Sequence, residues 1–319
     1  MIPKAELHVH LEGTAPPDLI RRIAQRNGLP LPEGLFDGDE RFVYTDFLDF
    51  LRAYDDAASV IRTGEDYRDI TYEYLRSCAD QGAIYVELTA SPDHAALVGL
   101  SDSEHLAGIA RGIDDARAHG IEGRILISAV RNFGVEQALR VARHAAERPH
   151  PYVVGFSMAG DEQNFPAQLF AEAYAIAADA GLGCTMHAGE WAGPESVRAA
   201  LELPITRISH GVRAIEDPAL VDELARRGIT LECCPTSNIA LGVFSSYEEH
   251  PLRRLADAGV RVTLGSDDPP YFGASIGGEY DIARQRLGFD EAGLKAITYA
   301  AIDAAFCDDG VKTALAARL

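Results

Sequence analysis

The chain is short of positive charge and of long hydrophobic runs. Its 319 residues include 29 Lys and Arg against 49 Asp and Glu, a formal net charge of −20 at pH 7. Nucleic acid and anionic membranes bind basic surfaces, so this balance argues against both as partners. No apolar run approaches the roughly 20 residues that a membrane-spanning helix needs. No apolar signal core precedes Lys4, and we therefore expect a cytoplasmic protein.

Cysteine is also scarce, and its pattern excludes a disulfide framework. The five cysteines are an odd number without a C-x-x-C pair, which favours reduced, mostly buried thiols. The adjacent Cys233 and Cys234 would point to opposite faces of a strand, so we expect two small buried residues there rather than a metal site. The H-x-E…P-C-x-x-C signature of one class of zinc enzymes is absent as well.

What the chain does have is a repeating local pattern. Five segments read as a helix that ends at a glycine, the usual left-handed cap, followed by a run of β-branched residues. Three further runs bring the strand candidates to eight, most of them apolar throughout, as strands buried on both faces are. The candidates are residues 5–10, 83–91, 124–132, 152–160, 183–190, 206–211, 229–237 and 260–268.

Eight strands alternating with helices predict an α/β fold, a (β/α)8 TIM barrel, with residues 1–319 as one domain. The alternative is an open doubly wound sheet, although no G-x-G-x-x-G follows the first strand. The connection after strand 1, about residues 14–82, is unusually long and contains the aromatic-rich segment YTDFLDFLRAYDDAASVIRT. We expect helices there that either form a lid or simply cover the barrel.

Reactive side chains gather at the carboxyl ends of the predicted strands, where a barrel has its active site. His8 and His10 are two residues apart on a strand, so both project to the same side about 6.5–7 Å apart. His187 and Asp267 stand at two other strand ends and could complete a ligand set. Imidazole and carboxylate together suit Zn²⁺, so the pattern indicates a zinc site.

The other histidines are divided by position. Six fall in loops, in helices or beside prolines and are interpreted as structural: His94, His105, His119, His144, His150 and His250. We expect the last of these at the surface or as a helix cap. The remaining four all stand at strand ends, whereas chance placement would scatter them.

Five motifs, LHVHLEG, AGDE, HAGE, SHG and SDDP, occur in this order and together resemble the adenosine deaminase family of the amidohydrolase superfamily. The resemblance runs from residue 3 to beyond residue 280. It implies a metal-dependent barrel that removes the 6-amino group of a purine by hydrolysis. It also implies one Zn²⁺ per chain, held by His8, His10, His187 and Asp267.

The resemblance implies catalytic roles for three further side chains. Glu190 of HAGE would protonate the purine ring nitrogen beside C6, which needs a carboxyl group whose pKa burial has raised. His210 of SHG would orient and deprotonate the attacking water. Asp268 would contact the imidazole-ring nitrogen of the purine, and Gly160 of AGDE would donate a backbone N–H to its pyrimidine ring.

His10 and Glu12 complete the expected substrate-binding set, and Glu12 bears on the substrate. Glu12 stands where the family has Asp, and Ser157 stands where it has an acidic residue. YVELTASP and FLDFLRAYDD resemble the nucleoside deaminases, so we expect adenosine or 2′-deoxyadenosine to be converted to inosine or 2′-deoxyinosine. The alternative, favoured by Glu12 and by SDDPPYFG, is an adenine or N6-substituted adenine deaminase that gives hypoxanthine.

Two other classes compete with this interpretation. A barrel hydrolase for phosphoesters or lactones would more often use two metals and a bridging carboxylated lysine, but no lysine occurs near the later strand ends. A catalytically inactive binding or scaffold protein would have no need for Glu190 and His210 beside the ligands. The expected partner is therefore a small purine nucleoside or base, and the oligomeric state stays open.

Overall fold

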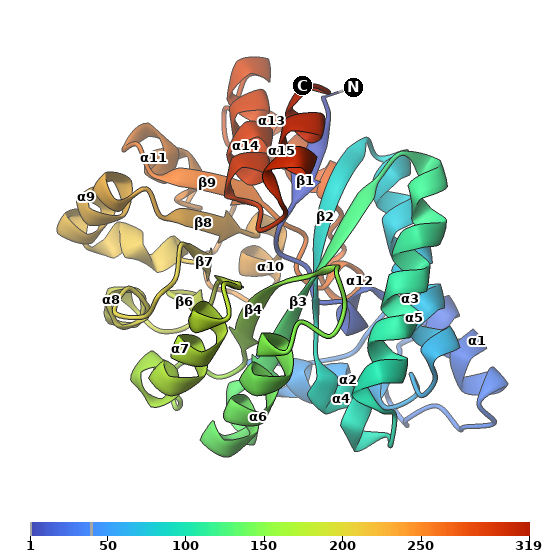
Figure 1. Cartoon of the computed structure of the whole chain (residues 1–319). Helices are drawn as coiled ribbons and strands as arrows, with labels where there is room; N and C mark the ends of the chain where they lie inside the picture. The colour runs from blue at the N-terminus through green and yellow to red at the C-terminus, as the bar shows by residue number, and fades with distance from the viewer. Residues whose placement is uncertain (1, 39–40) are drawn as a thin grey trace.

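The computed structural model describes residues 2–38 and 41–319, in which short parallel strands curl around a common centre and helices lie outside them (Figure 1). The predicted TIM barrel is confirmed. The strands are β1 Lys4–Glu6, β2 Ala83–Ala90, β3 Glu122–Val130, β4 Val153–Ala159, β5 Gly183–Cys184, β6 His187–Ala188, β7 Arg207–His210, β8 Thr230–Cys233 and β9 Arg261–Leu264.

Hydrogen bonding arranges the strands in two parallel runs, β1-β2-β3-β4-β5 and β6-β7-β8-β9. The predicted strand 183–190 is divided between them, but its backbone still bridges both neighbours. The Thr185 N–H donates to the carbonyl of Phe156 at 3.1 Å, and the Ser209 N–H donates to the carbonyl of Met186 at 2.9 Å. Residues 183–188 therefore act as one strand of the barrel.

The segment after β1 closes the barrel on the other side. Val9 pairs with Asp267 and His10 pairs with Thr89 as isolated parallel bridges. The Asp267 N–H donates to the carbonyl of His8 at 3.2 Å, and the His10 N–H donates to the carbonyl of Asp267 at 3.0 Å. The first and last strands of the barrel are thus held together by the residues expected to bind metal.

Several strands end earlier than the sequence pattern predicts. The predicted ranges 229–237 and 260–268 shrink to β8 and β9, because Pro235 begins a helix and pairing beyond Leu264 continues only as the isolated bridge between Asp267 and Val9. His210 and Asp267 adopt left-handed backbone conformations, with φ of 62° and 64°. These two residues carry reactive side chains and lie where the regular strand pairing stops. The sequence pattern did not show this point, so the predicted strands were too long.

The helices occupy the connections between strands, and none in the described parts of the chain combines the length and apolar character that crossing a bilayer demands. Gly228 and Gly259 end two of them in left-handed conformations, as predicted. The α-helices are α1 Pro17–Arg26, α2 Phe47–Ala58, α3 Gly64–Asp80, α4 Pro92–Leu97, α5 Asp102–Ala116, α6 Val135–Ala146, α7 Ala171–Asp179, α8 Pro194–Ala200, α9 Pro218–Arg227, α10 Pro235–Ala240, α11 Leu252–Asp257, α12 Pro269–Phe272, α13 Ile276–Gln285, α14 Glu291–Ala304 and α15 Asp309–Ala316. Short 3-10 turns are η1 Glu12–Thr14, η2 Arg117–His119, η3 Arg131–Phe133, η4 Ala167–Phe170 and η5 Val212–Glu216.

The long connection after strand 1 contains the helices that its pattern predicted. Helix α2 begins at Phe47 because the Asp46 side chain accepts a hydrogen bond from the Asp49 N–H at 2.9 Å, which caps the first turn. Helix α3 begins after Thr63, which forms a reciprocal capping box with Asp66. Helix α2 contributes its aromatic side chains to the pocket described below.

The barrel interior is more polar than the apolar strand patterns predicted. Arg207 is fully buried, with Nη2 2.7 Å from Glu87 Oε2 and Nε 2.6 Å from Glu232 Oε1. Its guanidinium carbon lies 3.5 Å from the centre of the Phe306 ring. Glu232 also lies 3.7 Å from His8 Nδ1, so this charged network reaches the strand ends. All five cysteines are buried free thiols, as predicted.

Candidate active site

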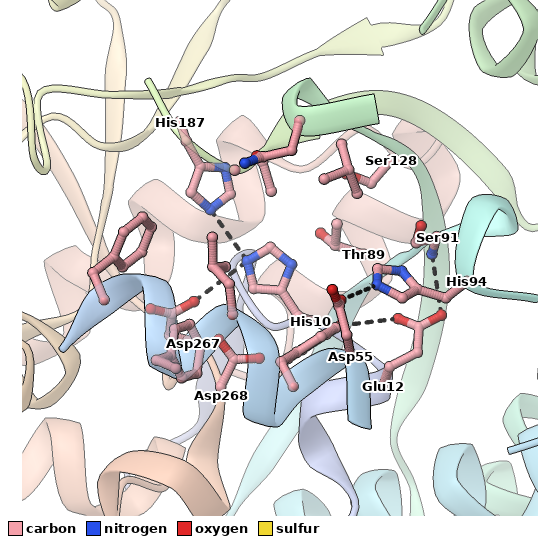
Figure 2. Close-up of a pocket in the computed structure, with 18 of the residues that line it drawn as sticks. His10, Glu12, Asp55, Thr89, Ser91, His94, Ser128, His187, Asp267 and Asp268 are labelled. Carbon is pink, nitrogen blue, oxygen red and sulfur yellow. Dashed lines mark hydrogen bonds and ion pairs between the residues drawn. The ribbon is translucent and has the colours of Figure 1, made fainter. Parts of the chain in front are cut away.

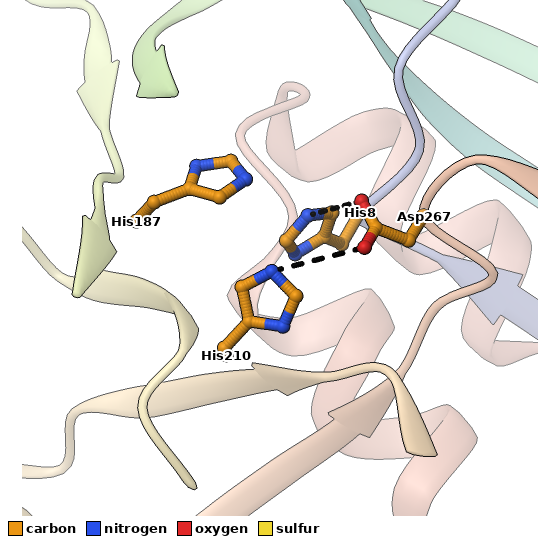
Figure 3. A group of neighbouring side chains, drawn as sticks. All are labelled: His8, His187, His210 and Asp267. Carbon is orange, nitrogen blue, oxygen red and sulfur yellow. Dashed lines mark ion pairs between the residues drawn. The ribbon is translucent and has the colours of Figure 1, made fainter. Parts of the chain in front are cut away.

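Four buried side chains from different strand ends point toward one another at one end of the barrel (Figure 3). Ligand atoms of His8, His187, His210 and Asp267 all lie within 4.8 Å of one another. Asp267 Oδ1 is 3.3 Å from His8 Nε2, and its Oδ2 is 3.9 Å from His210 Nε2. His10 joins this cluster, with Nε2 3.3 Å from Asp267 Oδ1 and 3.1 Å from His187 Nε2. The structure thus brings all four predicted metal ligands together.

Neighbouring groups orient these side chains. His187 Nδ1 lies 2.9 Å from the Met158 carbonyl, so Nδ1 carries the proton and Nε2 presents its lone pair to the cluster. Ser237 Oγ donates to Asp267 Oδ2 at 2.6 Å. The left-handed backbone of His210 and Asp267 costs energy in residues other than glycine, and such conformations concentrate at functional sites.

The donor set fits a bound cation. Both ring nitrogens of His8 are buried and lack a hydrogen-bond partner among the described residues. The Nε2 atoms of His10 and His187 face each other at 3.1 Å, an arrangement that a shared positive centre would stabilise. Burial alone would raise the pKa of Asp267, but the imidazoles of His10 and His8 beside it hold that pKa well below its usual range. Converging imidazoles and one ionised carboxylate are the ligands of a catalytic zinc site.

Glu190 lies beside the cluster, as expected for the glutamate of HAGE. Its Oε2 is 3.6 Å from His210 Nε2. Burial raises the pKa of Glu190 well above its usual range, and the nearby charges of Asp267 and Glu162 raise it further. A carboxyl group kept protonated in this way can donate a proton to a bound ligand.

The sequence motif AGDE predicted no role for Glu162. The structure shows that this residue holds the HAGE loop in place. Its carboxylate accepts hydrogen bonds from the N–H groups of Gly189 (2.8 Å), Glu190 (2.8 Å) and Ala192 (2.9 Å), and from Ser196 Oγ (2.5 Å). The motif was the available signal. The contact between two loops from different strand ends was not visible in it.

Asp268 points into the same pocket (Figure 2). Burial raises the pKa of Asp268 well above its usual range, and the adjacent Asp267 adds to this effect. Asp268 Oδ1 is buried without a hydrogen-bond partner among the described residues, so it is available to a ligand. Gly13 gives this carboxyl group its room, since a Cβ there would lie 1.8 Å from Asp268 Oδ1.

The pocket itself is small, with a cavity volume of about 140 Å³. An engineered apolar cavity of roughly 150 Å³ admits a single benzene ring, so this pocket suits one small ring system. Helix α2 supplies apolar lining from Phe47, Phe50, Leu51 and Tyr54. All predicted substrate-binding residues also line it: His10, Glu12, Gly160 and Asp268.

Glu12 is already engaged by protein groups. Its Oε2 accepts from the Tyr54 hydroxyl at 3.3 Å. Its Oε1 accepts from the Tyr67 hydroxyl at 3.3 Å and from the Ser91 N–H at 3.2 Å. Protein groups therefore occupy three of the roughly four acceptor positions of this carboxylate. Ser157, the other departure from the family pattern, is buried in β4.

Three of the six histidines set aside are buried. His94 lines the pocket, with Nε2 2.9 Å from Asp55 Oδ1 on α2, and His105 is buried behind it. His250 accepts a hydrogen bond from the N–H of Leu252, the first residue of α11, although the N-cap of that helix is Pro251. The expected surface position of His250 is wrong. Burial of these rings comes from helices distant in the chain, which leave no local sequence signal.

Comparison with known proteins agrees with this site. Residues 3–319 match the family described as adenosine deaminase. The chain belongs to the adenosine deaminase family. Its members are metal-dependent hydrolytic deaminases, so this chain is an enzyme of that kind, and the phosphoesterase and scaffold alternatives are excluded.

Named relatives are similar over nearly their whole length. An adenine deaminase of Mesorhizobium japonicum is 50% identical over 318 residues, which cover 99% of this chain and 98% of the relative. The crystal structure of an adenine deaminase from Arthrobacter aurescens has a TM-score of 0.92 at 30% identity, covering 99% of this chain and 97% of that one. A cog1816 amidohydrolase from Burkholderia ambifaria with bound Zn has a TM-score of 0.89 at 28% identity, covering 99% and 89%.

These relatives show that the expected preference for adenosine or 2′-deoxyadenosine is wrong, because the most similar of them are named adenine deaminases. The structure gives the physical reason. The aromatic segment FLDFLRAYDD was taken to favour a nucleoside and Glu12 to favour adenine, but the two are in contact, because Tyr54 of α2 donates its hydroxyl to Glu12 at 3.3 Å. The resemblance of YVELTASP to the nucleoside deaminases therefore did not predict the substrate preference.

Proposed function

We propose that the protein hydrolyses adenine to hypoxanthine and ammonia. The observation that carries the proposal is the position of Glu190, a buried carboxyl group with a raised pKa, 3.6 Å from His210 and at the wall of a cavity of about 140 Å³. Adenine is a flat bicyclic base whose ring nitrogen N1 and amino-bearing C6 are adjacent. Side chains on one face of such a pocket can therefore contact both N1 and C6.

The reaction needs an oxygen nucleophile, a proton donor and a path for ammonia. The oxygen of water adds to C6 while Glu190 gives its proton to N1. Of the water's two protons, one returns to the Glu190 carboxylate and the other goes to the amino nitrogen, so the bond between C6 and that nitrogen breaks and ammonia leaves. Protonation at N1 withdraws electrons from C6 and makes it a better electrophile. General acid catalysis of this kind contributes typically 10²–10⁴-fold. Raised by burial, the pKa of Glu190 supplies the protonated form at neutral pH.

His8, His10, His187 and Asp267 would hold a zinc ion, which when bound lowers the pKa of a water ligand from 15.7 to about 7. His210 lies across the cluster from His10 and orients the attacking water by a hydrogen bond. In this proposal Asp268 and the backbone N–H of Gly160 bind the two ends of the base. Asp268 has the buried, unpartnered Oδ1 that such a contact requires.

Selectivity for the free base follows from Glu12. In a nucleoside pocket a carboxylate at this position would accept a hydrogen bond from a ribose hydroxyl. Here two tyrosine hydroxyls and a backbone N–H already occupy three of its roughly four acceptor positions. Binding a ribose would break these bonds and displace Tyr54, leaving buried polar groups unpaired, a mismatch that discriminates by up to 10⁴–10⁵.

The test is turnover of a purine panel by zinc-loaded enzyme, followed by ammonia release and by chromatography of the product. We expect kcat/KM for adenine to exceed that for adenosine and 2′-deoxyadenosine by at least about 10²-fold. Glu190→Gln, which keeps the size of the side chain, should lose on the order of 10²–10⁴ in kcat. A kcat/KM for adenosine equal to that for adenine would overturn the proposed selectivity.

A further inference from the structure

Three buried polar side chains, of which His210 is the first, form a hydrogen-bonded line that leads away from the pocket. His210 Nδ1 lies 3.3 Å from Asn238 Nδ2, on α10. Asn238 Oδ1 lies 3.1 Å from His250 Nε2, in the loop that follows α10. His250 Nδ1 lies 3.3 Å from the backbone nitrogen of Leu252. Exposure of these three side chains is between 0% and 3%, so no solvent competes for their hydrogen bonds.

The backbone end of this line sets the direction of every bond in it. The N–H of Leu252 can only donate, so His250 Nδ1 must accept with its lone pair. Because burial lowers the pKa of His250 to about 3, its ring is neutral and carries its single proton on Nε2. That proton is donated to Asn238 Oδ1.

The orientation of the Asn238 amide then fixes the ring beyond it. With its oxygen toward His250, Asn238 turns its Nδ2–H toward His210 Nδ1, which must accept. A neutral His210 that accepts at Nδ1 carries its proton on Nε2. This is the atom that faces the pocket, 3.6 Å from Glu190 Oε2 and 3.9 Å from Asp267 Oδ2.

We propose that Asn238 and His250 are positioning residues that lock His210 in the tautomer with its proton on Nε2. This inference rests on the proposed function and assigns His210 a narrower part in it. Locked in this form, His210 donates a hydrogen bond to the oxygen nucleophile and orients it. It has no lone pair on Nε2 to accept the proton of the attacking water. The expectation that His210 also deprotonates the water is therefore replaced by a donor role.

The line also explains why a buried histidine lies so far from the chemistry. His250 packs edge-on against Phe244, with ring centres 5.3 Å apart, which restricts its rotation. The backbone carbonyl of Asn238 accepts from the N–H groups of Val243 (2.9 Å) and Phe244 (3.3 Å), so the loop that carries His250 is tied to Asn238 itself. The relay is thus rigid at each of its members.

The tautomer can be read directly by NMR of zinc-loaded protein labelled with ¹⁵N in histidine. The proton-bearing and bare ring nitrogens resonate far apart, and His210→Gln serves only to assign the signals of His210. We expect His210 to show Nε2 protonated and Nδ1 bare, and His250 to show the same form. A His210 signal with the proton on Nδ1, or with both nitrogens protonated, would overturn the proposal.

Asn238→Asp is the decisive variant, because it changes a donor to an acceptor with little change in size. The carboxylate would accept from His250 Nε2 and also from His210 Nδ1, so the proton of His210 should move to Nδ1. We expect kcat for adenine to fall by about 10²-fold while KM and zinc content change little. Asn164→Asp, which adds the same charge on an exposed loop, is the control and should leave the tautomer unchanged.

His250→Ala provides a second variant in case Asn238→Asp does not fold. Without His250 the Asn238 amide can turn over, so both tautomers of His210 should appear in its spectrum. An unchanged single tautomer in either variant would contradict the relay. If the wild-type enzyme turns over no purine, the proposed function fails, yet the spectra still decide whether the relay sets the tautomer.

Discussion

Both ring nitrogens of His8 are buried without a hydrogen-bond partner among the described residues, although Nε2 lies 3.3 Å from Asp267 Oδ1. An imidazole that is only 2% exposed in this state is stabilised chiefly by what it binds. His8→Ala should therefore lower zinc content from about one ion per chain to a small fraction of that. Elemental analysis after dialysis measures the loss.

The matched control for His8 is His119→Ala, which removes an exposed imidazole whose Nε2 lies 3.2 Å from the Tyr72 hydroxyl. It should retain the full zinc content. Equal zinc in both variants would remove His8 from the ligand set.

At the scale of residues, motif order predicted more than local pattern did. Parallel strands in a barrel end at the same edge, so residues at strand ends must meet. The clustering of the four proposed ligands was therefore predictable: His8, His10, His187 and Asp267. The burial of His94 and His250 was not, because it depends on contacts with α2 and α10, through Asp55 and Asn238. Such contacts between distant segments have no periodic signature in the sequence.

Among the elements, the start of α3 shows how one carboxylate joins separate helices. Asp66 caps α3, accepts from the Arg62 N–H at 2.9 Å and also binds Asn27 Nδ2 at 2.8 Å and Arg26, both at the end of α1. Asp66→Asn should reduce the free energy of unfolding by about 2 kcal/mol, since hydrogen bonds to charged groups contribute roughly 1.5–3 kcal/mol. Urea unfolding would measure it, with exposed Glu65→Gln on the same turn as the control.

The same residue predicts a pH dependence. Burial alone would raise the pKa of Asp66, but hydrogen bonds from Asn27 and the Arg62 N–H hold it below its ordinary value of 3.8. Its charged form therefore stabilises the fold above pH 3.8, and this contribution disappears as the pH falls through the lower folded value. The difference between wild type and Asp66→Asn should be constant near neutral pH and shrink below 3.8. A constant difference down to pH 2 would contradict this assignment.

The lengths of the elements were less predictable than their order. Every barrel strand was predictable, but the predicted strands at the site were too long. Apolar or β-branched residues continue there beyond the point at which regular strand pairing stops. Helix α2 was predictable from its aromatic-rich segment, whereas Asp46 as its cap was seen only in the structure. The contact of α2 with Glu12 through Tyr54, on which the proposed selectivity rests, was not predictable.

At the scale of the whole molecule, Arg207 joins β2, β7 and β8 through Glu87 and Glu232. Arg207→Met would leave two buried carboxylates without their cation. Removing one partner of a buried pair costs about 3–5 kcal/mol, so thermal unfolding should occur at a clearly lower temperature. Arg226→Met on the exposed face of α9 is the control. Equal unfolding temperatures would show that the network contributes nothing to stability.

The closing contact between the two ends of the barrel also sets the order of events on the ribosome. Glu6 of β1 accepts from Ser266 Oγ and from the Ser266 N–H, both at 2.7 Å, across 260 residues of chain. At about 5–20 residues per second, residue 266 follows Glu6 by roughly 13–50 s. Throughout that interval the nascent protein has an open sheet edge, and the proposed metal site lacks its last ligand, Asp267. The barrel of a growing chain can therefore close only after residue 266 has been synthesised.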